Sequence, residues 1–323
     1  MEKTTRSIRR RSLEDLNVMD DFLMNVAASD PEGGEEFCRL LLSILLEREI
    51  GKVRVNTQKV IPAYSPALRG IRMDVEVVED TEPVLNVYDI EPCLYHPKEG
   101  SLEKHNRFYQ GRIDGRYLRS GEWDFSRLPN LYVIMILPYD PFGEGYMMYR
   151  FRNKCEEVPE LDYQDGLRYI YLNTAGIKGG SPEIRQMLDY LQNSTEENVK
   201  GEMLQRIHRH VEKVKVRPEV REEYMLLEEK IYYERKEAAQ RADQQRRTAD
   251  ILELLEDYGK IPEKLQKRIE EEENPDVLKR WLKLAARWEA LRHLKNRWNS
   301  SKTRCNVPIA AEGLGFADKG DRR

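Results

Sequence analysis

The sequence predicts an α/β protein in which a mixed β-sheet flanked by helices is followed by an all-α C-terminal region. Two segments, Ile71–Val78 and Val84–Glu91, alternate apolar and polar residues as half-buried strands do. Leu131–Leu137 is a continuous apolar run, which is typical of a central strand covered on both faces. Glu219–Glu256 contains neither proline nor glycine and is rich in Lys, Arg, Glu and Gln, so it predicts a long helix.

Further helices and strands are predicted in the first half of the chain, before, between and after these segments. Asp20–Ala28 and Glu35–Glu47 are expected to be helices, because each carries apolar residues at helical spacing and a break with proline and two glycines separates them. A basic helix is expected between the alternating strands and the central strand. Tyr146–Phe151 and Leu167–Leu172 are expected to add further strands. Helices, strands, a helix and more strands in this order predict a sheet with helices against it.

In the second half, the long helix is expected to end near Gly259. An apolar stripe then follows at spacings of three and four, formed by Leu278, Trp281, Ala285 and Trp288. A helix with such a stripe must pack on the core or on a second copy of the chain, so homodimerisation is a hypothesis. The predicted division is a basic disordered tail 1–18, a core 19–200, a helical region 201–294 and a disordered tail 295–323.

Composition limits the partners that this chain can have. Charged residues make up 35% of the 323 residues, but the formal net charge is −4, so contact with nucleic acid must be local. The basic run Arg6, Arg9, Arg10 and Arg11 offers phosphate contacts, or it is simply part of a disordered tail. No apolar run is long enough for a membrane helix or a secretion signal. Four scattered cysteines match no zinc spacing, and we expect a reducing, cytoplasmic location.

Two carboxylates, Asp74 and Glu91, are the strongest chemical signal. Asp74 lies on the polar face of the first alternating strand, and Glu91 lies at the end of the second strand, directly before Pro92. Two acids on adjacent strands suit Mg²⁺, which takes one or two protein carboxylates and leaves its other positions to water and phosphate. The predicted reaction is phosphodiester hydrolysis. The alternative is that both acids are solvated residues on an exposed sheet face.

Three ordered segments carry a resemblance to a known family: RGIRMDVEVVED, VYDIEPCLY and KHNRFYQGRIDGRYLRSGEWDFSRLPNLYVIMILPYDPFG. They resemble the Rpn family of recombination-promoting nucleases and transposases, a branch of the PD-(D/E)XK nucleases. The likeness runs from about Met19 to about Gly180 and continues more weakly to about Leu294. It implies a restriction-endonuclease-like core, and the pair Asp21-Phe22 is similar to an aspartate and aromatic pair near the start of the family's sequences.

The resemblance implies that Asp74 and Glu91 are the metal ligands and that Cys93 occupies a catalytic position. The general nuclease pattern has lysine at that position, and the Rpn branch often has glutamine. A lysine would orient the attacking water and stabilise developing negative charge, whereas a neutral thiol does neither well. Glu76 and Asp89 share the faces of Asp74 and Glu91, so either is a candidate supporting acid or replacement ligand.

The basic helix after the acid pair carries the candidate DNA-binding residues, which are Lys104, Arg107 and Gln110. Spacings of three place them along one side of a helix. The resemblance supports Arg107 and Gln110, because an arginine followed by a Tyr-Gln pair recurs in the Rpn branch. The alternative is a solvated helix face whose other side packs on the sheet through Phe108, Ile113, Tyr117 and Leu118.

Together these observations predict a Mg²⁺-dependent DNA endonuclease, and Mn²⁺ is expected to substitute for Mg²⁺. The alternative from another class is a catalytically degenerate DNA-binding or interaction protein that keeps the nuclease fold, with Cys93 as the sign of lost activity. A third reading is an assembly module in which the charged helical half is the working surface.

Overall fold

The computed structural model describes residues 11–61, 71–98, 100–118, 120–257 and 259–300, with the backbone alone for 288–300. The chain divides into two compact units, Met1–Lys230 and Ile231–Arg323. Residues Arg6, Arg9 and Arg10 of the predicted basic run lie outside the described residues.

The first unit is built on a six-stranded mixed sheet with the strand order β1-β2-β3-β4-β6-β5. Parallel pairing joins β3 to β4 and β4 to β6, and the other neighbours are antiparallel. The five predicted strands are present, with bounds within two residues of the prediction. The strands are β1 (Val53–Ile61), β2 (Ile71–Glu79), β3 (Asn86–Pro92), β4 (Asn130–Leu137), β5 (Met148–Phe151) and β6 (Leu167–Asn173).

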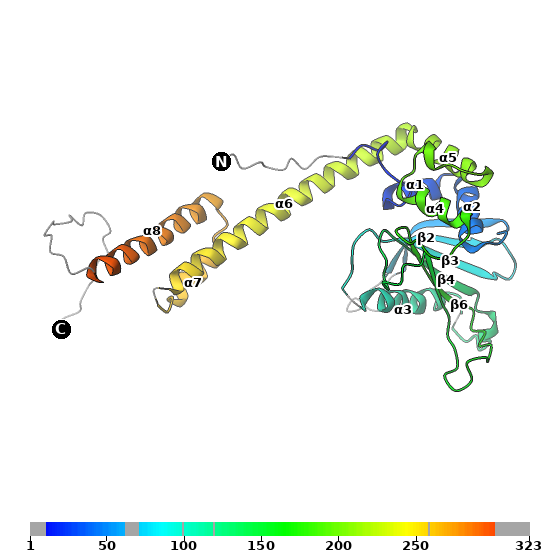
Figure 1. Ribbon diagram of the computed structural model, residues 1–323, viewed down its shortest axis with the longest axis horizontal. Helices are drawn as coiled ribbons and strands as arrows, with labels where there is room; N and C mark the ends of the chain where they lie inside the picture. The colour runs from blue at the N-terminus through cyan, green and yellow to red at the C-terminus, as the bar shows by residue number, and fades with distance from the viewer. Residues whose placement is uncertain (1–10, 62–70, 99, 119, 258, 301–323) are drawn as a thin grey trace. The chain divides into compact units, whose positions relative to one another are not determined.

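Helices cover both faces of this sheet, as Figure 1 shows. On one face α1, α2, α4 and α5 enclose the larger core, which includes Val75, Ile90, Ile134 and Leu172 from the strands. On the other face α3 contributes Tyr109 and Ile113 to a smaller core. The helices are α1 (Asp21–Ser29), α2 (Gly34–Leu46), α3 (Ser101–Asp114), α4 (Pro182–Gln192) and α5 (Glu202–Lys215), with short 3₁₀ turns at Phe125–Arg127 and Glu196–Asn198.

Strand β1 was not predicted, because the adjacent polar residues Gln58 and Lys59 interrupt the alternation of apolar and polar residues in Val53–Ile61. Its burial alternates along its length, as expected of an edge strand with one face in solvent. Gln58 adopts a left-handed backbone conformation, with φ of 52°. This conformation is uncommon for residues other than glycine, and it distorts β1 beside β2.

The predicted disordered tail 1–18 is wrong for residues 11–18, which pack against the first unit. Leu13 and Leu16 are 4% exposed, and Val18 is fully buried in the larger core. Arg11 forms a salt bridge of 2.6 Å with Asp20. Apolar side chains at short spacing therefore outweigh the basic composition of this segment, since burying them removes apolar surface from water.

The predicted boundary between core and helical region at residue 200 is also wrong. Helix α5 buries Leu204, Ile207, Val211 and Val214 in the larger core, and the first unit extends to Lys230. The boundary falls within the long helix α6 (Pro218–Glu256), which was predicted almost to the residue.

The second unit contains the end of α6, α7 (Glu263–Glu270) and α8 (Pro275–Ser300). Its small core joins Ile251, Ile269 and Leu278, with Trp281 packed against them. The predicted stripe is therefore confirmed at Leu278, Trp281 and Ala285, whereas the side chain of Trp288 lies outside the described residues. Helix α8 continues to Ser300, so the predicted loss of structure from residue 295 is wrong up to that point. Homodimerisation stays a prediction.

None of the helices in the described part of the chain is both long and apolar enough to cross a lipid bilayer.

Candidate active site

Strands β2 and β3 bring the two predicted carboxylates together. Their antiparallel register pairs Val75 with Ile90, so the next position of the same register places Asp74 opposite Glu91. The Asp74 backbone N–H donates to Oε1 of Glu91 at 3.0 Å. Residues directly opposite on antiparallel strands present their side chains on the same face, and the two acids therefore meet at one end of the strand pair.

Asp74 and Glu91 line a cavity of about 470 Å³, and a third acid, Asp21, lines it from the start of α1. The cavity is lined by residues of α1, β2, β3, β4, α3 and the segment between β3 and α3. Besides the three acids these are Ile71, Arg72, Pro92, Cys93, Tyr95, Pro97, Ser101, Leu102, His105, Tyr109 and Met135. Asp21 was predicted only through the family resemblance, and α1 places it in this cavity.

Burial makes these carboxyl groups hard to ionise. Glu91 is 7% exposed, and desolvation together with the negative charges of Asp89 and Asp74 raises its pKa well above the ordinary value. Burial also raises the pKa of Asp74, although a hydrogen bond with the Glu91 carboxyl and the positive charge of Arg72 oppose the shift. Desolvation and the charge of Asp74 raise the pKa of Asp21 to about 6.

Asp89 adds a fourth acid next to Glu91, although it does not line the cavity. It is completely buried, and among the described residues neither of its oxygens accepts a hydrogen bond from an amide, hydroxyl or cationic donor. Desolvation raises the pKa of Asp89 to about 8, and the Glu91 carboxyl is its hydrogen-bonding neighbour. Buried acids without a cation are costly. A divalent cation that needs only two protein carboxylates, Asp74 and Glu91, would fit these donors and would offset the cost of burying the neighbouring acids.

The carboxylate of Glu76, the other predicted supporting acid, is bound by partners that lie outside the cavity. Its buried carboxylate forms salt bridges with Arg116 and, at 2.5 Å, with Lys59. Asn56 Nδ2 donates to the same carboxylate at 3.0 Å. Glu76 does not line the cavity, so it holds β1, β2 and the segment after α3 together instead of serving the site.

Cys93 lies in the cavity wall, where the family pattern has lysine. Its backbone N–H donates to the carbonyl of Ile136 at 2.9 Å, which continues the β3–β4 pairing. The thiol is almost completely buried and donates to the carbonyl of Tyr95 at 3.4 Å. Burial raises the pKa of this thiol, so Cys93 is neutral at physiological pH and supplies no positive charge to the site.

Three further side chains, from β2 and α3, also line the cavity. Arg72 brings a cation into the cavity, and Tyr109 donates to the Arg72 carbonyl at 3.2 Å. The ring of His105 packs against the ring of Tyr109 in a tilted arrangement, with centroids 4.0 Å apart. Arg72 lies two residues before Asp74 on the same face of a predicted strand, and this spacing is the signal that would have identified it. Tyr109 belongs to the Tyr-Gln pair of the family resemblance, but placing Tyr109 and His105 in the cavity required knowledge of which face of α3 points to the sheet.

The predicted DNA-binding residues lie outside this cavity. Lys104 and Arg107 are exposed, and Gln110 is partly buried and donates to Asp114 at 2.5 Å. The predicted packing of this segment on the sheet is confirmed at Ile113, which is fully buried, and at Tyr117, which packs against the smaller core. It is wrong at Phe108, which is 41% exposed. The exposed face of α3 thus lies beside the cavity-lining face, and the role of Lys104, Arg107 and Gln110 in DNA binding stays a prediction.

Within the described residues, no three His, Cys, Asp or Glu side chains form a cluster able to hold a metal ion. A structural zinc site is therefore not the chemistry that this site suits, since zinc usually takes four such ligands. Mg²⁺ needs fewer protein ligands, and its remaining positions go to water and phosphate oxygens. His208 and His210 have separate partners, Tyr190 at 3.1 Å and the carbonyl of Ala27 at 2.8 Å.

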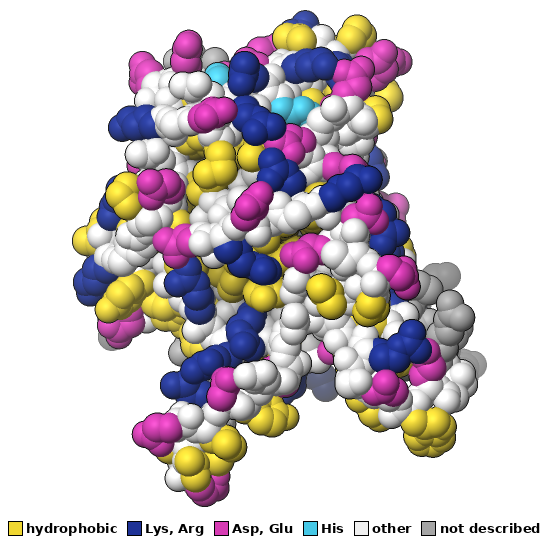
Figure 2. Space-filling view, turned by 90° about the vertical axis from the view of Figure 1, so that its right-hand side faces the viewer, with side chains coloured by type: hydrophobic (Ala, Val, Ile, Leu, Met, Phe, Trp, Pro, Cys, Tyr) yellow, Lys and Arg dark blue, Asp and Glu magenta, His cyan; other side chains and the backbone are white. Residues whose placement is uncertain are grey.

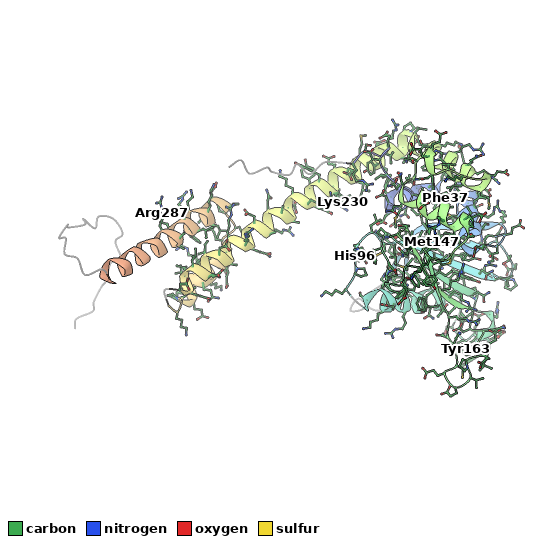
Figure 3. All side chains as sticks on the ribbon, in the orientation of Figure 1. Phe37, His96, Met147, Tyr163, Lys230 and Arg287 are labelled. Carbon is green, nitrogen blue, oxygen red and sulfur yellow. The ribbon has the colours of Figure 1, made fainter. Side chains whose placement is uncertain are left out.

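The surface seen in Figure 2 intermixes acidic and basic side chains without a large area of one sign. In Figure 3, His96 lies near α3, where it stacks on Tyr139 with ring centroids 3.7 Å apart. Comparison of the chain with family models, with curated proteins and with solved structures gave no match.

Proposed function

We propose that this protein is a Mg²⁺-dependent DNA endonuclease of the recombination-promoting type, in which Asp74 and Glu91 hold the ion. The single observation that carries the proposal is the cross-strand pairing of these two carboxylates in one cavity, fixed by the 3.0 Å hydrogen bond from Asp74 N to Glu91 Oε1. The mixed sheet with helices on both faces supports a restriction-endonuclease-like core. The sequence resemblance supports the same family.

Different residues of the cavity would have different roles in such a reaction. When bound, the ion would make a water molecule more acidic and offset negative charge on the phosphate. Asp74 and Glu91 would supply its protein ligands, and Asp21, which lines the same cavity, would be a further acceptor for water. Arg72 places a fixed positive charge beside the acids, which is the electrostatic role that lysine fills in the general nuclease pattern.

Plasmid cleavage tests this proposal. Supercoiled DNA is incubated with the protein and Mg²⁺ or Mn²⁺, and nicked and linear products are quantified. We expect cleavage that stops in EDTA and falls by at least about 100-fold in Asp74→Asn and Glu91→Gln, because even residues behind a metal's ligands change activity by about 10- to 100-fold.

Asp80→Asn is the matched control. Asp80 follows β2 directly, lies outside the cavity and pairs with Lys52 at 3.3 Å and Arg54 at 3.2 Å. The Asp80→Asn variant should cleave DNA as fast as the native chain does. Cleavage that survives both Asp74→Asn and Glu91→Gln would show that the activity has another source.

The second candidate function is a non-catalytic DNA-binding protein that keeps the nuclease fold. The observation that favours it is Cys93, a buried neutral thiol at the position of the lysine. This candidate predicts that the native chain retards DNA in a gel with Mg²⁺ and leaves it intact. Retardation without cleavage in both Mg²⁺ and Mn²⁺ would favour it over the endonuclease.

A further inference from the structure

Helix α8 is strongly basic within an acidic chain. Its 26 residues contain seven Lys or Arg and two acidic residues, a formal net charge of +5, whereas the whole chain has a formal net charge of −4. Four of the cations belong to the part whose side chains are described, and all four are exposed: Lys279, Arg280, Lys283 and Arg287. Arg287 is labelled in Figure 3.

These four cations lie on one face of the helix. Lys279, Lys283 and Arg287 follow one another at steps of four residues, and Arg280 lies three residues before Lys283, so their side chains are neighbours on the helix surface. Like charges at this spacing destabilise an isolated helix. A row of this kind is therefore most stable when an anion with several charges lies along it.

No acidic side chain within the described residues neutralises this face. None of the four cations takes part in a salt bridge there, although other cations of the same unit do. On α6, Arg241 pairs with Glu237 at 3.4 Å and Arg247 with Asp243 at 2.7 Å. On α7, Lys267 pairs with Glu271 at 3.7 Å. The four cations of α8 thus form a row of neighbouring exposed charges that no acidic side chain of the described residues pairs with.

The opposite face of α8 is already occupied. Leu278 is fully buried and Ala285 is 5% exposed, and Trp281 and Leu282 pack against the small core around Ile251 and Ile269. The orientation of the helix within its unit is therefore fixed, and it turns the four cations outward.

We propose that this outward face of α8, formed by Lys279, Arg280, Lys283 and Arg287, binds the phosphate backbone of a nucleic acid. Steps of four residues place successive cations about 6 Å apart along the helix axis. A DNA strand presents one phosphate per ~3.4 Å of duplex axis, so the row meets several phosphates at once. The site is separate from the cavity of the first unit and does not depend on the proposed cleavage activity.

Nucleic acid fits this face better than a membrane surface does. A helix that lies in a membrane interface buries an apolar face among the lipid chains. The apolar face of α8 is committed to the core of its own unit, and among its described side chains Leu284, 55% exposed, is the one large apolar group left in solvent. A face with charge and almost no apolar surface recognises backbone phosphates without reading the base sequence.

Fluorescence anisotropy of the full chain with a labelled mixed-sequence duplex, in EDTA so that no cleavage occurs, tests the proposal. The test variant combines Lys279→Gln, Arg280→Gln, Lys283→Gln and Arg287→Gln. The control variant makes the same change in net charge on exposed residues of α6 in the same unit, with Arg235→Gln, Lys236→Gln, Arg241→Gln and Arg246→Gln. Circular dichroism confirms that both variants remain helical.

We expect the α8 variant to bind the duplex at least about tenfold more weakly than the α6 variant at about 50 mM salt, and its salt dependence to be shallower. Each phosphate contact contributes about 0.9 to the slope of log affinity against log salt, so the loss of four contacts lowers the slope by up to about 3.6. Asp74→Asn should bind like the native chain, which separates this proposal from the cleavage proposal.

Two outcomes would overturn the proposal. In the first, the α8 variant binds the duplex probe as tightly as the α6 variant does, and the two variants also bind a single-stranded probe with equal affinity. In the second, the four cations of α8 are needed for binding to vesicles of anionic phospholipid and have no effect on binding to DNA.

Discussion

The backbone N–H of Asp74 donates to Oε1 of Glu91 at 3.0 Å, so one candidate ligand holds the other in place across two strands. This arrangement fixes the Glu91 carboxylate without a partner cation. It also brings the two acids to one end of the strand pair, where β3 ends at Pro92. The fixed geometry and the raised pKa values of the two acids lead to the predictions below.

Mg²⁺ binding should be stronger at pH 8 than at pH 6. The pKa values of Asp74 and Glu91 are raised, and a carboxyl group must lose its proton before it can bind a metal. Isothermal titration calorimetry in two buffers of different ionisation enthalpy should therefore show proton release on binding. Glu91→Gln should weaken binding and Asp80→Asn should not; an affinity independent of pH and of Glu91 would mean that the ion binds elsewhere.

Cys93→Lys should increase cleavage at least about tenfold, since a positive charge aimed at the developing negative charge can be worth about 10²- to 10³-fold. Cys93 lines the cavity, so a lysine there reaches the same space as Asp74 and Glu91. Initial rates of plasmid nicking measure the effect. Cys155→Lys, at another free cysteine outside the cavity, is the control. Equal rates in Cys93→Lys and the native chain would show that the missing lysine does not limit the reaction.

Glu76→Gln should lower the free energy of unfolding by roughly 3 kcal/mol, because it leaves the positive charges of Lys59 and Arg116 without their buried partner. Urea unfolding followed by circular dichroism measures the change. Asp80→Asn breaks two salt bridges that are more exposed to solvent, so it should lower the free energy of unfolding by about 1 kcal/mol or less. A loss below about 1 kcal/mol in Glu76→Gln would contradict the structural role assigned to this residue.

Asp89 should make the metal-free protein less stable as the pH rises. Its pKa is about 8 in the folded protein against an ordinary value of 3.8, so between these values the folded chain keeps a proton that the unfolded chain has lost. The free energy of unfolding then falls with rising pH, by up to about 1.4 kcal/mol per pH unit for one proton. Asp89→Asn has no such proton and should flatten this slope in urea unfolding with EDTA; an unchanged slope would contradict the assignment.

Much of the sheet could be predicted from the sequence because apolar alternation and the continuous run of β4 are local signals. Strand β1 was missed because Gln58 and Lys59 interrupt its alternation, and its pairing with β2 is visible only in three dimensions. The packing of Leu13, Leu16 and Val18 was missed for the same reason, since a short apolar pattern does not show what it packs against.

The candidate site was predictable where chemistry and strand geometry coincide, as at Asp74 and Glu91. It was not predictable where it depends on the orientation of a helix. The charge pattern of α3 led to the prediction that Lys104 and Arg107 bind DNA, whereas the face of α3 that lines the cavity carries His105 and Tyr109. A helix exposes several faces with similar sequence signals, and the sheet alone decides which of them turns inward.

Diffraction from crystals soaked in Mn²⁺ tests the central claim most directly, because the anomalous signal locates the ion without assuming its ligands. The account predicts one strong peak bonded to a carboxylate oxygen of Asp74 and to one of Glu91, and no such peak in Asp74→Asn. An ion bound at any other group, with Asp74 and Glu91 left without metal at saturating Mn²⁺, would contradict it.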